Sequence, residues 1–252
     1  MVGAVLQELD RAGLADNTIV LFLSDHGMAF PGVKANCYPD STRSPWIIRW
    51  PGVVAAGQDD RLHMLSCVDL QSTFLEAAKL PPATQTDGRS FLPILQGGKQ
   101  EKRDYVFTQF FHIHGKDAYP MRGILSRDWA YLFNPWADGK RIFPRQWNGF
   151  DALRKAAQTN PLMQRRVGHL SFRTVEEFYS LREDPHCLSN LLETEPSSPD
   201  NPIPVNRFRE KLRELMIRIS DPALPAFNGR RDPRALQSFM KSYTDRATKE
   251  IE

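Results

Sequence analysis

An apolar strand that ends in two polar side chains constrains the fold of this chain more than any other feature. Residues 19–23 read IVLFL, a run without alternation, as expected of a strand that is covered on both faces. A helical pattern over residues 2–9 and a short turn precede this run, and such a unit is typical of a βαβ sheet. Open α/β sheets bind ligands at the carboxyl ends of their strands, where Asp25 and His26 stand here. The sequence therefore predicts an α/β fold with a site at this strand end.

Asp25 and His26 also restrict what this site can hold. A carboxylate and an imidazole side by side are costly to bury unless a cation neutralises them. A lone cation, Lys34, follows nine positions after Asp25. We interpret the stretch as half of a metal site with Asp25 and His26 as ligands. For Asp25 the alternative is a capping role after the strand, and for Lys34 it is an ordinary loop lysine.

The length and composition are those of an ordinary globular protein. The chain has 252 residues, of which 41% are hydrophobic and 25% are charged. These values allow one large domain, or a domain with a smaller appendage. No apolar run approaches the roughly 20 residues that span a bilayer. The helical pattern begins directly after Met1, so we predict neither a membrane span nor a signal peptide within this chain.

The basic residues are unevenly distributed. The formal net charge of +3 is too small to imply a nucleic-acid partner, but residues 140–173 hold eight Lys or Arg and one acid, Asp151. Aromatic side chains are interleaved among them: Phe143, Trp147, Phe150 and Phe172. The region is either a solvated basic face or a surface for an anionic partner. It matches no nucleic-acid reader motif, so we expect no nucleic acid.

The pattern of elements changes near residue 100. Before it, residues 46–50 predict a second strand and residues 68–79 a helix. After it come short aromatic-rich candidate strands, which predict a small antiparallel sheet. These strands are 105–111, 123–126, 129–133 and 177–181.

Helices are expected between and after these strands. Residues 151–167 predict one helix, and residues 205–219 predict a terminal helix with one apolar face. The stretch 195–204, with four prolines, reads as a linker, and the last thirty or so residues read as a polar tail that is either docked or mobile. We divide the chain into residues 1–100, 101–194 and 195–252.

Several stretches in the same order resemble the sulfatase family of the alkaline-phosphatase-like superfamily. They are GLADNTIVLFLSDHG (13–27) with the later Lys34, RSPWII (43–48), VDLQSTFL (68–75), DGRSFLPILQG (87–97) and FYSLREDP (178–185). The last two are similar to the family patterns DGxSLLPLLxG and ELYDLxxDP. His112, His114 and the run Tyr119–Arg122 further resemble the heparan N-sulfatase (sulfamidase) branch.

The resemblance implies the C-terminal part of an alkaline-phosphatase-like sandwich. Residues 1–100 would be the C-terminal portion of the catalytic domain, a mostly parallel sheet with flanking helices. Residues 101–194 would be a small antiparallel subdomain, and a linker, a terminal helix and a tail would follow.

The family's nucleophile has no counterpart in this chain. Sulfatases use a formylglycine made from Cys or Ser in a C/S-x-P-x-R motif near the N-terminus, with two consecutive aspartates before it. The run Cys37–Ser41 has serine where the arginine is required, and it lies after the metal strand. The Asp59-Asp60 pair follows the wrong strand. We therefore expect a fragment that is catalytically incomplete by itself, with the formylglycine in a missing N-terminal half. The cysteines, Cys37, Cys67 and Cys187, have no metal or disulfide spacing.

The resemblance gives roles to the residues after the strand. Asp25 and His26 would hold a divalent cation, calcium by family, and Lys34 would bind the sulfate, with His26 and Lys34 as the catalytic pair. Many sulfatases carry asparagine at the position of His26, and an imidazole makes Mn²⁺ or Zn²⁺ possible. His26 could instead contact the nucleophile or substrate, and Arg43 either orders the loop or forms a surface salt bridge.

Three further residues are candidates for sugar recognition. His112, His114 and Arg122 could bind a sulfated sugar, because guanidinium groups bind sulfate or carboxylate in a bidentate fashion. The alternative is a structural role for each of them.

The resemblance implies a sulfatase that hydrolyses sulfate esters or sulfamates on sulfated sugars such as glycosaminoglycans. One alternative is a non-catalytic remnant that binds sulfated polysaccharide, and another is a phosphonate or phosphodiester hydrolase of the same superfamily. For the full-length family member we expect a periplasmic or secreted location.

Overall fold

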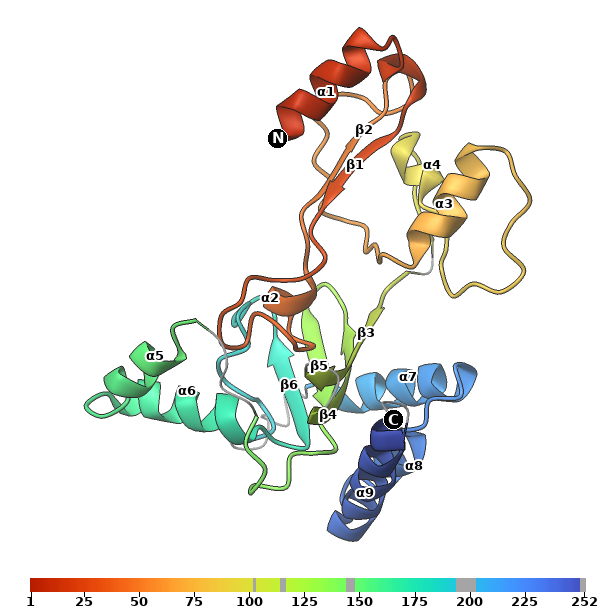
Figure 1. Ribbon diagram of the computed structural model, residues 1–252. Coiled ribbons are helices and arrows are strands. Elements are labelled where there is room, and N and C mark those ends of the chain that lie inside the picture. The colour runs from red at the N-terminus through yellow and green to blue at the C-terminus, as the bar shows by residue number, and fades with distance from the viewer. Residues whose placement is uncertain (102, 114–116, 144–147, 194–202, 250–252) are drawn as a thin grey trace. The chain divides into compact units, whose positions relative to one another are not determined.

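The computed structural model describes residues 1–101, 103–113, 117–143, 148–193 and 203–249. The chain forms two compact units (Figure 1). Unit 1 comprises Met1–Asp25 and Ser44–Val106, and unit 2 comprises His26–Arg43 and Phe107–Glu252. Residues 26–43, which we call the loop segment, thus belong to unit 2 although unit 1 precedes and follows them in sequence. Across the described ranges, no helix has the length and apolar character to cross a membrane.

Unit 1 contains a two-stranded sheet and short helices. Its elements are α1 (Val2–Arg11), the 3₁₀ helix η1 (Ala15–Asn17), β1 (Val20–Leu23), β2 (Trp46–Arg49), α3 (Asp69–Ala77) and α4 (Leu92–Leu95). β1 and β2 are antiparallel, with Phe22 opposite Ile47. The α/β class is confirmed, but the mostly parallel sheet that we predicted is wrong for these two strands. A parallel pair needs a crossover, usually a helix, whereas the connection here is the loop segment with only the four-residue helix α2 (Pro39–Thr42).

Asp69 organises the second half of unit 1. Its side chain is fully buried and accepts hydrogen bonds from the backbone N–H groups of Ser66 and Arg89, at 2.9 and 2.8 Å, and from the Arg103 guanidinium. A Cβ on Gly88 would lie 1.9 Å from the Val68 carbonyl oxygen, so only glycine allows this close approach. Two of the stretches that resemble the sulfatase family, 68–75 and 87–97, are therefore in contact.

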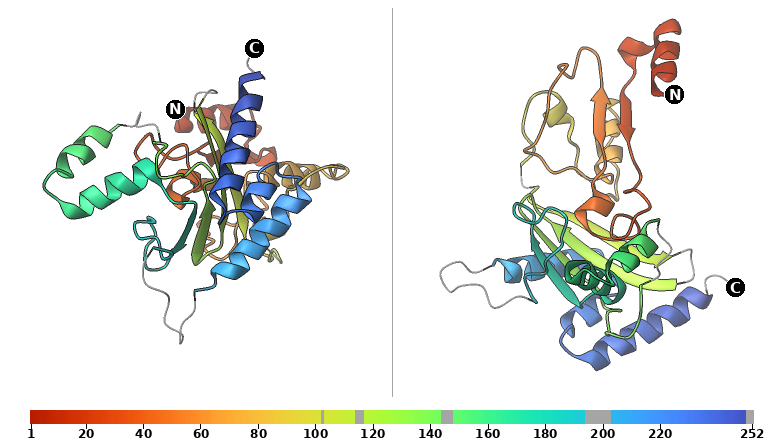
Figure 2. Two further views of the ribbon diagram at one scale, coloured as in Figure 1. Left: turned by 90° about the horizontal axis from the view of Figure 1, so that it is seen from below. Right: turned by 90° about the vertical axis from the view of Figure 1, so that its left-hand side faces the viewer.

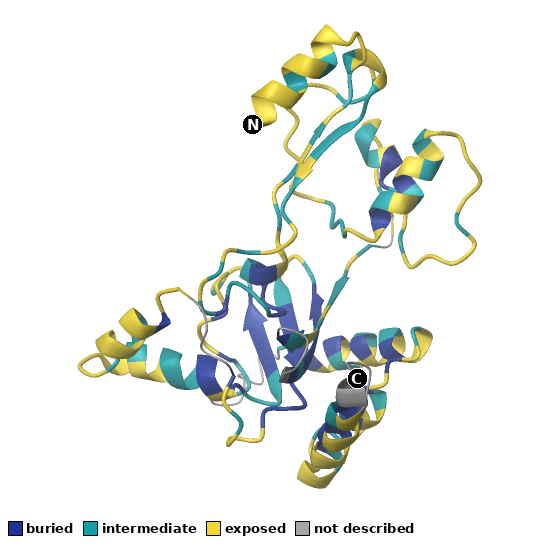
Figure 3. Cartoon of the chain, viewed as in Figure 1, coloured by how far each residue is buried: buried dark blue, intermediate teal, exposed yellow. Residues whose placement is uncertain are grey.

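Unit 2 is built on a four-stranded sheet in the order β3-β4-β5-β6. The strands are β3 (Val106–Ile113), β4 (Asp117–Leu125), β5 (Trp129–Phe133) and β6 (Glu176–Ser180), and the β4–β5 and β5–β6 pairs are antiparallel. The predicted small antiparallel sheet is confirmed. Most residues on β5 and β6 are buried (Figure 3).

The helices of unit 2 differ from the prediction in two places. They are α5 (Phe150–Ala156), α6 (Pro161–Phe172), α7 (Val205–Arg218), α8 (Leu224–Asn228) and α9 (Pro233–Lys249). The single helix expected over 151–167 is two helices, because Pro161 cannot continue a helix but can begin one, and the Asn160 side chain caps α6. The helices α8 and α9 were not predicted, and of the two alternatives for the tail the structure shows the docked one, since these helices bury Phe227, Phe239 and Met240.

Both faces of the sheet in unit 2 are covered. Helices α7 and α9 lie on one face, which we call the helix face, and α6 lies on the other side (Figure 2). Side chains of a strand alternate between faces. On β6, Phe178 packs edge-on against Phe208 of α7, whereas Glu177 and Tyr179 contact Tyr38 of the loop segment. The face that carries Glu177 and Tyr179 is the loop face.

Candidate functional site

The glycine after His26 lets the loop segment close on itself. A Cβ on Gly27 would lie 2.2 Å from the backbone oxygen of Val33 and 2.3 Å from that of Asp40. The Gly27 N–H also donates to the backbone oxygen of Ser41 at 3.0 Å. Only glycine permits this approach of three backbone segments. The backbone directly after His26 is therefore fixed against the middle and the far end of the loop segment.

Lys34 lies in the middle of this loop and is half-buried. Before it, Gly32 has a φ of +78° and packs so closely on α6 that a Cβ would lie 3.2 Å from Leu170. After it, Ala35 has a φ of +56°, and Asn36 is buried. The loop segment is therefore packed against the rest of unit 2 both before and after Lys34.

Asp25 and His26 are exposed. The His26 Nδ1 lies 2.7 Å from the Gly27 carbonyl oxygen. A carbonyl only accepts, so Nδ1 carries the proton and the neutral ring has its lone pair on Nε2, the arrangement of a metal-ligating histidine. Within the described ranges, no group of three or more His, Cys, Asp or Glu could hold a metal ion. Two donors are fewer than the four or more ligands a divalent cation takes. The donor types fit a metal site, but the set is incomplete, and the assignment of Asp25 and His26 stays a prediction.

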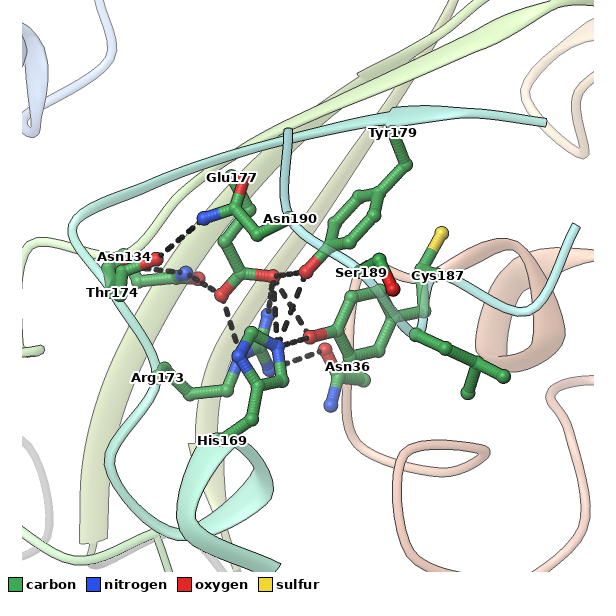
Figure 4. A network of polar contacts seen from close by, with 12 residues as sticks. Asn36, Asn134, His169, Arg173, Thr174, Glu177, Tyr179, Cys187, Ser189 and Asn190 are labelled. Carbon is green, nitrogen blue, oxygen red and sulfur yellow. Dashed lines mark hydrogen bonds and ion pairs between the residues drawn. The ribbon is translucent and has the colours of Figure 1, made fainter. Parts of the chain in front are cut away.

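A network of polar side chains joins the loop segment to the loop face (Figure 4). Its centre is Glu177, whose side chain is fully buried. The Glu177 carboxylate accepts hydrogen bonds from the hydroxyls of Tyr38 at 2.8 Å and Tyr179 at 2.7 Å, and from the Asn134 amide at 2.7 Å. The Arg173 guanidinium binds it in a bidentate fashion, at 2.7 and 3.1 Å. Five donor groups from four residues therefore converge on one carboxylate.

Arg173 extends the network to a second residue of the loop segment. Its Nη1 donates to Asn36 Oδ1 at 2.9 Å, and its guanidinium lies 4.3 Å from the centre of the Tyr38 ring. The same Asn36 oxygen accepts the backbone N–H of Cys37 at 3.0 Å. Glu177 is thus connected to the loop both directly and through Arg173.

The charges of the network explain its protonation. Burial alone would raise the pKa of Glu177, but Arg173, together with its other donors, holds that pKa well below the usual range. The same pairing keeps the pKa of Arg173 above its ordinary value despite burial. Burial raises the pKa values of Tyr38 and Tyr179, which therefore stay neutral donors.

The tautomer of His169 follows from these donors. Its Nε2 lies 2.7 Å from the Tyr38 oxygen and 3.1 Å from the Tyr179 oxygen. Both hydroxyl hydrogens point to Glu177, so each tyrosine oxygen is an acceptor and His169 Nε2 is the donor.

The predicted sugar-binding residues lie elsewhere in unit 2. Arg122 is 1% exposed, and its Nε and Nη2 donate to the Asp221 carboxylate at 2.5 and 2.9 Å. A substrate contact through this guanidinium would require the pair to open, so the structure supports a packing role. His112 stacks on Tyr243 with 5.4 Å between ring centroids, and its Nε2 is buried without a hydrogen-bond partner. His114 lies outside the described residues.

The structure also shows the burial of Cys37, Arg43 and the basic stretch 140–173. Cys37 is fully buried against Gly123, and burial raises the pKa of its thiol to about 11, so it is not a reactive thiolate. Arg43 is exposed. In the basic stretch 140–173, Lys140, Arg154, Lys155 and Arg165 are exposed, whereas Phe143, Phe150 and Arg173 are buried.

Sequence reasoning gave no role to Glu177, Arg173 or His169. One signal could have indicated Glu177, because it stands directly before the FYSLREDP stretch, where the family pattern begins with glutamate. Tyr38 and Glu177 are 139 positions apart, and no local pattern connects them.

Comparisons with known proteins show which proteins this chain resembles. Residues 32–138 match the family described as N-sulphoglucosamine sulphohydrolase, C-terminal. The human N-sulphoglucosamine sulphohydrolase is 29% identical over 206 residues, which are 75% of this chain and 40% of the human protein. The chain thus spans about two fifths of that relative.

Solved structures share the fold. One holds its substrate D-glucosamine-2-N,6-O-disulfate and has a TM-score of 0.60 at 20% identity, covering 87% of this chain and 38% of that chain. The phosphonate monoester hydrolase of Agrobacterium radiobacter has a TM-score of 0.58 at 21% identity, covering 86% and 38%. The family match and the similarity to the human protein together support a C-terminal portion of a sulfatase-family protein.

Proposed function

We propose that this chain is part of a sulfatase that hydrolyses sulfate esters or sulfamates on sulfated amino sugars. The observation that carries the proposal is the match of residues 32–138 to the N-sulphoglucosamine sulphohydrolase family. This range includes Lys34 and most of the loop segment. The related structure with a bound glucosamine disulfate supports a carbohydrate substrate.

Lys34 is proposed as the cation that contacts the sulfate. A fixed ammonium group in a partly buried loop stabilises the negative charge that develops on the transferring sulfuryl group. The close packing of Gly32 and the side-chain hydrogen bond of Asn36, on either side of Lys34, support this proposal. His26 is the second catalytic candidate of the chain.

Asp25 and the Nε2 of His26 would hold a divalent cation, for which we propose calcium by family resemblance, or Mn²⁺ or Zn²⁺ because of the imidazole. A cation bound there would polarise the sulfate oxygens. The nucleophile is proposed to come from a formylglycine segment outside this chain, because Cys37 is buried and protonated.

A phosphonate monoester hydrolase is the second candidate. The solved structure of such an enzyme shares this fold, so the fold by itself does not separate the two chemistries. The family match of residues 32–138 favours the sulfatase.

The test compares kcat/KM for a sulfated sugar and for a phosphonate monoester. The enzyme is a protein that joins this chain to a segment with the C/S-x-P-x-R motif. We expect sulfate release from glucosamine N-sulfate to exceed hydrolysis of a phosphonate monoester in kcat/KM. The reverse preference would replace the sulfatase by the second candidate.

A further inference from the structure

We propose that Glu177 is a positioning residue for Lys34, because its buried network holds the loop segment on the sheet. The sulfate-binding role of Lys34 rests on the proposed function, but the attachment of the loop segment by the Glu177 network does not. Glu177 touches neither substrate nor metal in this proposal, and it acts through the loop.

The network reaches the loop on the C-terminal side of Lys34. Tyr38, four positions after Lys34, donates directly to the Glu177 carboxylate. Asn36, two positions after Lys34, accepts from Arg173, which the same carboxylate neutralises. Loss of the Glu177 charge would therefore weaken both attachments together.

The loop conformation needs such an external anchor. Ala35, between Lys34 and Asn36, has a φ of +56°, a left-handed conformation that an alanine adopts at a cost. Strained residues of this kind persist only where surrounding contacts over-determine them. The Asn36 contact with Arg173 is the next side-chain anchor along the chain.

Apolar burial does little to hold the first half of the loop. Met28 is 68% exposed and Phe30 is 43% exposed, so neither contributes fully to the core. Deeply buried side chains begin only at Asn36, where the network begins. The first half of the loop segment therefore depends on attachments that begin at Asn36, which are the polar network and the buried Cys37.

A matched pair of tyrosines tests this inference. Tyr179 and Tyr131 are both fully buried, and each donates one hydrogen bond of 2.7 Å to a glutamate of β6. The acceptor is Glu177 on the loop face for Tyr179, and Glu176 on the helix face for Tyr131. Tyr179→Phe and Tyr131→Phe thus each remove one hydroxyl that donates to a glutamate of β6, on opposite faces of the sheet, and the Tyr179 hydroxyl also accepts from His169.

The measurement is amide hydrogen exchange on the whole chain, resolved by residue or short peptide. Tyr179→Phe is expected to speed exchange of protected loop amides such as Gly27, Val33 and Ser41 by about tenfold. Exchange in β5 and at the Leu191 N–H, which donates to Phe178, should stay near wild type. Tyr131→Phe should leave the loop amides unchanged.

Three results would overturn the inference: no change in the loop for Tyr179→Phe, an equal change for both variants, or acceleration spread evenly over unit 2. Glu177→Gln is a second, stronger variant that should repeat the local effect in the molecules that fold. If it does not fold, the tyrosine pair still decides. The exchange experiment needs no substrate, so a failure of the sulfatase proposal would be seen separately, in sulfate release.

Discussion

Two neighbouring glutamates of β6 hold the two faces of the same sheet by different means. On the helix face, Glu176 accepts from Tyr131 and from Arg209 and Arg230, at 2.7 to 3.0 Å. On the loop face, Glu177 binds a fully buried arginine and two tyrosines. The two carboxylates are adjacent in sequence, but they attach different parts of the chain.

The faces differ in what else holds them. The helix face has an aromatic core in which Phe227 packs edge-on against Phe133 at 5.1 Å, and Phe178 stacks on Trp129 at 5.1 Å. Burial of each such side chain contributes about 1.5–3 kcal/mol, so the Glu176 cluster is one attachment among several. The loop face depends on a buried ion pair, which is stable only while both partners are present. This difference indicates that fewer independent contacts attach the loop segment, which carries Lys34, than attach the helices on the opposite face.

Substitution of the two glutamates should show this difference most strongly. Glu177→Gln keeps the shape but leaves the Arg173 charge buried without an anionic partner, which is expected to cost about 3–5 kcal/mol in the free energy of unfolding. Glu176→Gln is expected to cost about 1–2 kcal/mol, because Arg209 and Arg230 can turn to water. Urea denaturation of both variants measures the difference. Equal losses would remove the distinction between the faces.

Alanine substitution of two glycines of unit 2 is expected to change stability in opposite directions, by less than substitution of Glu177. A Cβ on Gly123, on the loop face, would lie 2.5 Å from Thr108 Oγ1 and 3.1 Å from Cys37 Cβ. Gly123→Ala is expected to destabilise by about 1–3 kcal/mol through overpacking. Gly168→Ala in α6 meets no described atom within 4 Å and should stabilise by about 0.5–1 kcal/mol through helix propensity. Thermal denaturation measures whether each substitution lowers or raises the stability. Unchanged stability in Gly123→Ala would mean that Cys37 is not packed against the sheet.

Acid should weaken the loop face before the core of the helix face. The pKa of Glu177 is lowered in the folded state from an ordinary value of 4.5, so its stabilisation is complete above about pH 4.5 and is lost as the pH falls toward the lowered value. The stability gap between wild type and Glu177→Gln should therefore narrow between pH 6 and pH 3. The pKa of Glu176 is also lowered, and Glu176→Gln should show a smaller narrowing. Unfolding free energies across this range provide the test, and a constant gap for Glu177→Gln would contradict the assignment.

Local patterns in the sequence predicted much of the fold. The aromatic run 129–133 is strand β5 with the same bounds, and the apolar spacing after Val205 is helix α7. The helices of the tail were not predicted, because α9 buries only one stripe of a polar sequence, including Phe239 and Tyr243. Periodicity over a few turns is a weak signal when most positions face water.

The site was harder to predict because its contacts are long-range. Arg122 reads as a sulfate ligand until its partner Asp221, 99 positions later, is known. Glu177 and Tyr38 meet only because the loop segment returns to the sheet of unit 2. A buried charge must find a partner, but the sequence does not say which one.

Sulfate release by a Lys34 variant tests the account most directly. In a protein that joins this chain to the C/S-x-P-x-R segment, Lys34→Ala is expected to lower kcat/KM for glucosamine N-sulfate about 100-fold, as loss of one charge-stabilising donor does. Lys155→Ala, which removes an exposed lysine of α5, is the matched control and should retain near wild-type activity. Unchanged turnover in Lys34→Ala would contradict the role of the loop segment as part of a sulfatase site.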